Sequence, residues 1–137
     1  MNYLLDTSAW LRSALNPETL PVSVKNLVAN PDETFGISIF TLWEIAKKNQ
    51  KGKLPLPMEL TAWFKAAAPG NVQIIALTPE IIVEAARLPE FPTNDPADEL
   101  IVATARVLKL RLVTSDTKLK NYRHARIHYF KPVEPKT

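Results

Sequence analysis

The sequence predicts a single α/β domain in which a mainly parallel sheet carries helices on both faces. Two observations support this prediction. A length of 137 residues fits one ordinary domain. Short apolar runs typical of buried strands alternate along the chain with longer amphipathic segments typical of helices, which is the order of a parallel α/β sheet. We expect one domain over residues 1–130 and a loose tail over residues 131–137, where prolines are frequent.

The first half of the chain predicts two strands and four helices. The strands are expected over residues 3–5 and 35–39, where apolar and β-branched residues are grouped. Helices are expected after Asp6, after Pro21 and over residues 58–68. Another helix is expected to begin at Thr41, because Thr41 and Glu44 have the Ser/Thr-x-x-Glu spacing of a capping box.

The second half predicts three more strands, over residues 72–77, 111–114 and 127–130. Helices are expected over 79–88 and from Asp95 to about residue 110. Pro79 and Pro96 occupy the first helical position in these two segments, where proline is favoured. A short basic helix is expected after Asp116, before the last strand.

The composition excludes several kinds of chemistry. The absence of cysteine rules out disulfides, a thiolate zinc site and a cysteine nucleophile. His124 and His128 are the only histidines, too few for a His-rich metal site. Three glycines leave no phosphate-cradling loop. Ser8 or Ser115 as a nucleophile would need a nearby base, and both histidines lie late in the chain.

The charge is uneven along the chain. The formal net charge is +3, but residues 103–137 hold nine Lys and Arg against two acids, and residues 54–102 hold two against seven. The basic segments suggest a partner that carries negative charge, although a basic surface can also simply be solvated. Asp6 interrupts the first apolar stretch, so it does not resemble a signal peptide, and no run suits a membrane span. We expect a cytoplasmic protein with no membrane contact.

Five acids are expected near one edge of the sheet. Asp6 and Asp116 directly follow predicted strands, and Glu44 lies early in the helix after the second strand. Asp95 and Asp98 stand at the start of the long helix. Because chemistry in α/β sheets gathers at the carboxyl ends of the strands, these side chains are expected to converge.

Each acid also has a structural interpretation, since Asp6, Asp95 and Asp116 could cap helices and Glu44 could complete a capping box. Several carboxylates at one edge would nevertheless repel one another, and a hard divalent cation with oxygen ligands would remove that repulsion. The predicted ion is Mg²⁺ or Mn²⁺. Such a site suits phosphodiester hydrolysis, in which the metal activates a water molecule.

Four segments resemble the motifs of PIN-domain nucleases, especially VapC toxins of type II toxin–antitoxin pairs. They are residues 4–8 (Leu-Leu-Asp-Thr-Ser), 41–45 (Thr-Leu-Trp-Glu-Ile), 95–105 and 112–116 (Leu-Val-Thr-Ser-Asp). The resemblance spans nearly the whole chain. It implies a three-layer α/β/α fold and metal-dependent cleavage of RNA. The chain departs from many relatives at Glu99, where they carry arginine.

The resemblance also implies residue roles. The catalytic metal ligands would be Asp6, Glu44, Asp98 and Asp116, with Asp95 as a possible addition. Supporting hydroxyls would come from Thr7, Ser8, Thr114 and Ser115. Cations near the motifs are expected to hold RNA: Lys47, Lys48, Lys51, Lys53, Lys118, Lys120 and Arg123.

Expected partners are RNA, a cognate antitoxin protein and, as is usual in the family, a second copy in a homodimer. Trp43, Trp63 and Phe64 are candidates for an antitoxin groove, because at least one Trp is expected to be exposed. The alternatives are a core role for these aromatics, an RNA-processing nuclease without an antitoxin, and a non-catalytic interaction module whose acids are caps.

Overall fold

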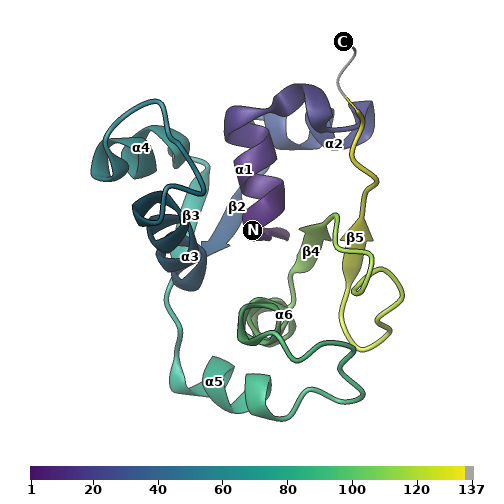
Figure 1. Ribbon diagram of the computed structural model, residues 1–137. Helices are drawn as coiled ribbons and strands as arrows, with labels where there is room; N and C mark the ends of the chain where they lie inside the picture. The colour runs from purple at the N-terminus through teal and green to yellow at the C-terminus, as the bar shows by residue number, and fades with distance from the viewer. Residues whose placement is uncertain (135–137) are drawn as a thin grey trace.

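The computed structural model describes residues 1–134, which alternate strands and helices (Figure 1). The strands are β1 (Tyr3–Leu5), β2 (Phe35–Ser38), β3 (Val72–Ile75), β4 (Arg111–Thr114) and β5 (Ile127–Tyr129). The α-helices are α1 (Thr7–Leu15), α2 (Val22–Ala29), α3 (Ile39–Gln50), α4 (Leu60–Ala67), α5 (Pro79–Ala86) and α6 (Pro96–Leu108). A 3₁₀ turn, η1 (Pro17–Thr19), joins α1 to α2.

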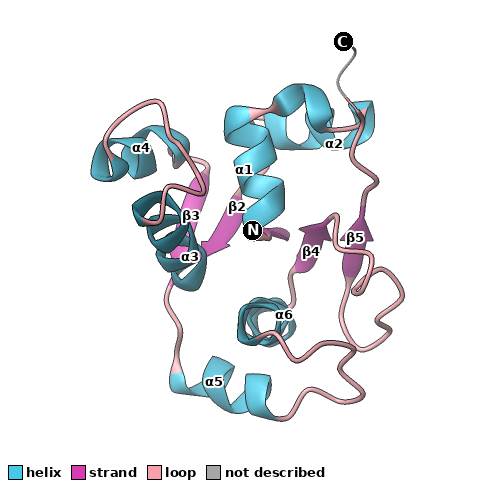
Figure 2. Cartoon of the chain, in the orientation of Figure 1, coloured by secondary structure: helices cyan, strands magenta, loops and turns pink. Residues whose placement is uncertain are grey.

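The five strands form one sheet in the order β3-β2-β1-β4-β5, and every neighbouring pair is parallel. The prediction of a parallel α/β sheet is therefore confirmed (Figure 2). Because β1 lies at the centre and all strands run the same way, their carboxyl ends share one edge. Asp6 follows β1, and Asp116 comes two residues after β4. Glu44 lies in α3, which follows β2, so the three acids come after neighbouring strands of the sheet.

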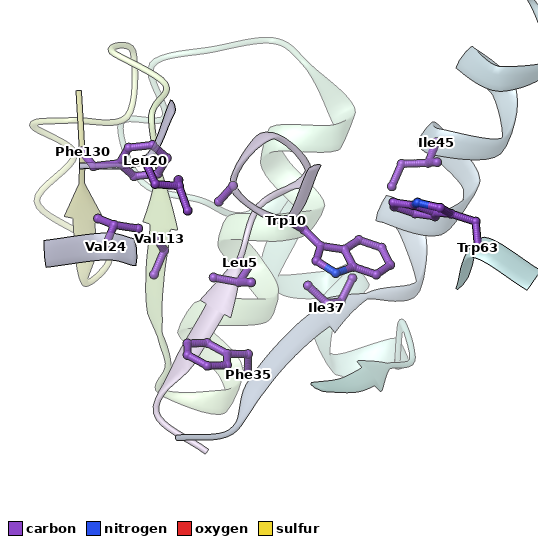
Figure 3. Close-up of a cluster of buried hydrophobic side chains, with 11 residues drawn as sticks. Leu5, Trp10, Leu20, Val24, Phe35, Ile37, Ile45, Trp63, Val113 and Phe130 are labelled. Atoms are coloured by element: carbon purple, nitrogen blue, oxygen red, sulfur yellow. The ribbon is translucent and has the colours of Figure 1, made fainter. Parts of the chain in front are cut away.

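Helices cover both faces of the sheet and give the expected three layers (Figure 1). Successive side chains of a strand point to opposite faces, and Leu5 and Leu4 accordingly join different cores. Leu5 packs in a cluster with Trp10 of α1, Ile45 of α3 and Trp63 of α4 (Figure 3). The other core contains Leu4 and the buried side of α6, and α5 packs on α6 from outside.

The start of α3 differs from the prediction. The helix begins at Ile39 rather than Thr41, and Ser38 is its N-cap, with its hydroxyl accepting a hydrogen bond from Phe40 N at 3.1 Å. The expected capping box of Thr41 and Glu44 is therefore wrong. The apolar residues Ile39 and Phe40 extended the strand pattern in the sequence, but the hydroxyl of Ser38 ends the strand one residue earlier.

The basic helix expected after Asp116 is also wrong, because residues 117–121 form consecutive turns. Their amides bond three residues back, as in Leu119 N to Asp116 O at 3.1 Å, and Asp116 Oδ1 accepts from Lys118 N at 2.9 Å. The bonds here span three residues, as in turns, and are not continued by the four-residue spacing of an α-helix. Other elements are shorter than expected: α4 covers 60–67, β3 ends at 75, α5 at 86 and β5 at 129.

The last described residues keep a contact with the domain. Phe130 is buried, and Val133 N donates to Thr19 O at 2.8 Å. Residues 135–137 of the expected loose tail lie outside the described residues. Within residues 1–134, every helix is too short or too polar to cross a membrane.

Candidate active site

The five predicted acids line one open cavity of about 590 Å³ at the carboxyl edge of the sheet. The wall includes Asp6, Glu44, Asp95, Asp98 and Asp116, together with Thr7, Ser8 and Ser115. These residues come from segments spread over most of the chain. The parallel strand order brings the segments together, as the sequence led us to expect. Glu99, which departs from the family pattern, is not among the residues that line the cavity.

Asp6 links β1, α1 and β4. Its Oδ1 accepts a hydrogen bond from Ala9 N at 2.7 Å and caps α1, and its Oδ2 accepts from the hydroxyl of Thr114 at 2.5 Å. Burial raises the pKa of Asp6 to about 6, with the charges of Asp116 and Asp98 adding to the rise and the two hydrogen bonds opposing it. Asp6 is thus both a helix cap and a carboxylate held against its preference for water.

Glu44 is oriented by a pair of threonines. The Thr7 hydroxyl donates to Glu44 Oε1 at 2.7 Å, and the hydroxyl of Thr41 lies 3.0 Å from that of Thr7. Since the Thr7 proton is used toward Glu44, Thr41 donates to Thr7. Thr41 is fully buried and positions Glu44 through Thr7. The capping-box spacing had suggested a different role for Thr41, and its true neighbour lies 34 residues away.

Asp98 is held by Thr93, which sequence reasoning did not single out. The Thr93 hydroxyl donates to Asp98 Oδ2 at 3.1 Å and accepts from Asp95 N at 3.1 Å. Burial, and next the charge of Asp95, raise the pKa of Asp98 above its ordinary value. Asp95 Oδ1 accepts from Ala97 N at 2.9 Å, so Asp95 is the N-cap of α6. The position of Thr93, two residues before the helix cap Asp95, was the signal in the sequence that could have indicated this role.

The hydroxyls on β4 and α1 differ in what they contact. Thr114 is fully buried, donates to Asp6 and accepts from Asp116 N at 3.0 Å, so one side chain connects two of the acids. The hydroxyls of Ser8 and Ser115 lie 3.4 Å apart and contact each other rather than a carboxylate. Thr7 and Thr114 therefore touch acids directly, while the two serines line the same cavity beside them.

The donor set suits a hard divalent cation, although its side chains are not gathered around one point. Within residues 1–134, no three acids or histidines stand close enough together to form a ready-made metal site. Glu44, Asp98 and Asp6 instead turn to their threonine partners. All the donors are oxygen atoms, and the pKa values of Asp6 and Asp98 are raised partly by neighbouring acids. Mutual repulsion of this kind is what a bound cation would relieve.

The cations expected to hold RNA are distributed unevenly. Lys48 lines the acid cavity, as does Arg12, which the sequence analysis did not single out and whose Nε lies 3.4 Å from Ser8 Oγ. Lys118 Nζ lies 4.0 Å from Asp116 Oδ2, and Lys120 Nζ lies 4.9 Å from the centre of the Tyr129 ring. Arg123 is engaged by Glu90 at 2.9 Å. Lys47, Lys51 and Lys53 do not line the cavity, although they belong to α3 and the segment after it.

Comparison with known proteins points to one family. The model of the PIN domain matches residues 3–125, which is most of the chain. Ribonuclease VapC22 of Mycobacterium tuberculosis is 29% identical over 123 residues, covering 90% of this chain and 93% of that protein. The matched region contains all five acids of the cavity.

Solved structures share the fold. A VapBC complex from Salmonella typhimurium bound to DNA superposes with a TM-score of 0.72 at 16% identity, covering 94% of this chain and 98% of that chain. A toxin–antitoxin complex from Klebsiella pneumoniae gives a TM-score of 0.67 at 16% identity, covering 95% and 99%. At such low identity these likenesses establish the common fold and the correspondence of its layers.

Proposed function

The chain belongs to the PIN-domain family, and we propose that it is a metal-dependent endoribonuclease, the toxin of a type II toxin–antitoxin pair. The observation that carries this proposal is the single cavity that Asp6, Glu44, Asp95, Asp98 and Asp116 all line. The similarity of the chain to a VapC ribonuclease, which extends over 90% of its length, supports RNA as the substrate. The likeness of the fold to a toxin–antitoxin complex supports a toxin over a nuclease of general RNA processing.

The residues that would hold a divalent ion are Asp6, Glu44, Asp98 and Asp116. Asp95, the N-cap of α6, lines the same cavity. When bound, Mg²⁺ or Mn²⁺ supplies a Lewis acid that lowers the pKa of water and stabilises charge on a phosphate. The chain itself provides orientation: Thr114 holds Asp6, Thr7 holds Glu44 and Thr93 holds Asp98. Such bonds set the direction of each carboxylate before substrate arrives.

Two cations complete the proposed site. Lys48 and Arg12 line the same cavity as the acids. Positive side chains here would attract the phosphates on either side of the scissile bond, and an arginine can engage a phosphate with two parallel hydrogen bonds. We propose that they position the RNA backbone while the acids carry the metal.

The direct test is cleavage of RNA by purified protein. Total bacterial RNA, with its ribosomal and transfer RNAs, is incubated with Mg²⁺, with Mn²⁺ or with EDTA. Discrete fragments are expected with either metal and none with EDTA. Cleavage that persists in EDTA would come from a contaminant or a metal-independent enzyme and would contradict the proposal. No cleavage under any condition, together with no thermal stabilisation by metal, would favour the interaction module whose acids are caps.

An apolar patch beside the cavity suits the antitoxin. It consists of Ile39, Phe40 and Trp43 of α3, hereafter the α3 patch, and helical spacing places the three on one side. Trp43 is 56% exposed, and its ring lies 5.5 Å from that of Phe40. The next residue, Glu44, lines the acid cavity. Trp63, by contrast, is 3% exposed and packs against Trp10 at 5.4 Å. We therefore propose Trp43, and not Trp63, as the docking residue for the antitoxin.

We expect the two tryptophans to separate docking from stability. Trp43→Ala should weaken antitoxin binding by about 2 kcal/mol, because an exposed Trp is a frequent interface anchor, and should leave the melting temperature nearly unchanged. Trp63→Ala should lower the free energy of unfolding by about 3–5 kcal/mol through the cavity it creates. For each variant, the affinity for the protein encoded by the neighbouring gene is measured by calorimetry, and the stability is measured by thermal melting. Unchanged affinity of Trp43→Ala would exclude the α3 patch as the docking surface.

A further inference from the structure

The edge of the sheet opposite the acids carries a cluster of cations. Lys109, Arg111 and Arg126, hereafter the far-edge cluster, line a cavity of about 220 Å³ together with Asn2 and Tyr3. All three cationic residues are exposed. Arg111 is the first residue of β4, whereas Thr114 at the other end of this strand contacts Asp6. The two cavities therefore lie at opposite ends of the same strands.

The backbone holds the far-edge cluster in place. Arg111 N donates to Asn2 O at 2.9 Å, and Leu112 N donates to Arg126 O at 2.8 Å. These bonds connect the starts of β1, β4 and β5 in the pairing order of the sheet. Lys109 is the C-cap of α6, two residues before β4. Three cations from the end of a helix and the starts of two strands are thus brought to one cavity by regular secondary structure.

No acid compensates this charge. Within residues 1–134, no acidic side chain lines the cavity, and none lies within 4.0 Å of the charged groups of the cluster. Neighbouring arginines are paired, since Arg106 contacts Glu84 and Arg123 contacts Glu90, each at 2.9 Å. Burial, and next the charge of Arg111, lower the pKa of His128 on β5. Clustered like charges repel, and a bound anion would relieve that repulsion.

Lys109 has a left-handed backbone conformation, which glycine adopts more easily than lysine. Its φ is 56° and its ψ is 42°, the left-handed region in which glycine commonly ends a helix. A residue with a side chain is strained there, by about 1 kcal/mol. Strain of this kind is often found at functional positions. The chain thus places a cation where glycine would suit the backbone better.

We propose that the far-edge cluster binds backbone phosphates of the RNA substrate, outside the segment that is cleaved. This inference rests on the proposed function and adds a second contact surface to it. Strands rise about 3.3 Å per residue, so the two ends of β4 lie about 10 Å apart. The side chains extend beyond both ends, so the two surfaces are at least this far apart, and a folded RNA would contact both by passing around the edge of the sheet. β5 is the edge strand between the two surfaces, and Lys120 lies over Tyr129 on it.

The test compares two triple variants that lose the same charge. Lys109→Gly, Arg111→Gln and Arg126→Gln are combined in the cluster variant, and Lys25→Gln, Lys65→Gln and Arg87→Gln in the control. The control residues are exposed and line neither cavity. Binding of a labelled RNA stem-loop is measured by fluorescence anisotropy in EDTA, so that the RNA stays intact, over a series of salt concentrations.

The cluster variant should bind about tenfold more weakly at low salt, and its slope of log affinity against log salt should fall by about 2–3, since each lost phosphate contact removes about 0.7–0.9. The control should keep a slope close to that of the wild type. Equal losses in both variants, or none in either, would overturn the proposal. If polyglutamate displaced the labelled stem-loop from the cluster as effectively as unlabelled stem-loop does, the surface would be assigned to an acidic protein. That outcome would also overturn the proposal.

Lys109→Gly alone guards against a folding artefact. Glycine relieves the left-handed strain while removing one charge, so the melting temperature should stay the same or rise as RNA affinity falls. Unchanged affinity of this variant and of Arg126→Gln would contradict the phosphate contacts. Cleavage with Mn²⁺ is followed separately. Salt-dependent binding at the cluster without any cleavage would reject the nuclease function alone, whereas cleavage by the cluster variant with the wild-type KM would reject this inference alone.

Discussion

Asp6→Asn is expected to lower RNA cleavage by roughly 10²–10³-fold or more while the protein remains folded. Loss of a metal ligand removes several kcal/mol of transition-state stabilisation. The fold should survive because asparagine is also a good N-cap and can keep the bond from Ala9 N. The measurement is the initial rate of fragment formation in Mn²⁺ at equal protein concentration, with circular dichroism to confirm folding.

Asp95→Asn is the matched control for this substitution. Asp95 lines the same cavity and also caps a helix, but it is exposed and its carboxylate bonds Ala97 N. We expect a smaller effect on cleavage and a stability loss of about 1 kcal/mol or less, because asparagine retains the cap. A wild-type cleavage rate for Asp6→Asn would show that Asp6 is not a ligand. Equal losses in both variants would place Asp95 among the ligands.

The second large effect concerns the stability of the metal-free protein. The pKa of Asp6 is raised from 3.8 to about 6 in the folded state. Between these values the folded state keeps a proton that the unfolded state has released, so stability falls as the pH rises. The full change corresponds to about 3 kcal/mol, and nearly all of it falls between about pH 3 and pH 7. The pKa of Asp98 is raised too, and it acts in the same direction.

The contribution of Asp6 is obtained from the difference between wild type and Asp6→Asn, measured by urea unfolding in EDTA across this pH range. The difference is needed because the lowered pKa of His128 gives a slope of the opposite sign. Asp6→Asn should be the more stable protein at pH 7 and should lose this advantage as the pH falls to about 3. Parallel curves of stability against pH for the two proteins would contradict a raised pKa of Asp6 in the folded state.

A bound metal should offset the loss of stability that ionised Asp6 causes at neutral pH. A ligand that binds only the folded state adds about 2.7 kcal/mol at 100 times its Kd. Mn²⁺ at neutral pH is therefore expected to raise the melting temperature of the wild type progressively, and that of Asp6→Asn much less. A wild-type melting temperature that is unchanged up to millimolar Mn²⁺ would argue that the acids act only as caps and turn residues.

Local patterns were enough to predict the sheet and the positions of its acids. Short apolar runs, amphipathic periods and prolines at helix starts act over a few residues, so they are legible in one sequence. Asp6 and Asp95 cap the helices that directly follow them. Once the strands are parallel, their carboxyl ends must share an edge, and the cavity lined by the acids follows from that order.

Contacts between distant segments were decided by the tertiary structure. Thr41 was expected to cap its own helix, but packing of α1 beside α3 gives it Thr7 as a partner. Likewise, Trp43 and Trp63 have similar sequence surroundings, yet only Trp63 is buried, because α4 lies against Trp10.

The sequence by itself thus determined most of the elements, the parallel direction of the strands and the acids at one edge, because helix periods, caps and strand runs are local interactions. The tertiary structure alone decided which hydroxyl holds which acid and where the cations gather. Lys109, Arg111 and Arg126 form one surface only after β4 pairs with both β1 and β5. Such neighbours depend on strand pairing and on the close packing of side chains across layers, and neither is encoded in the spacing of residues along the chain.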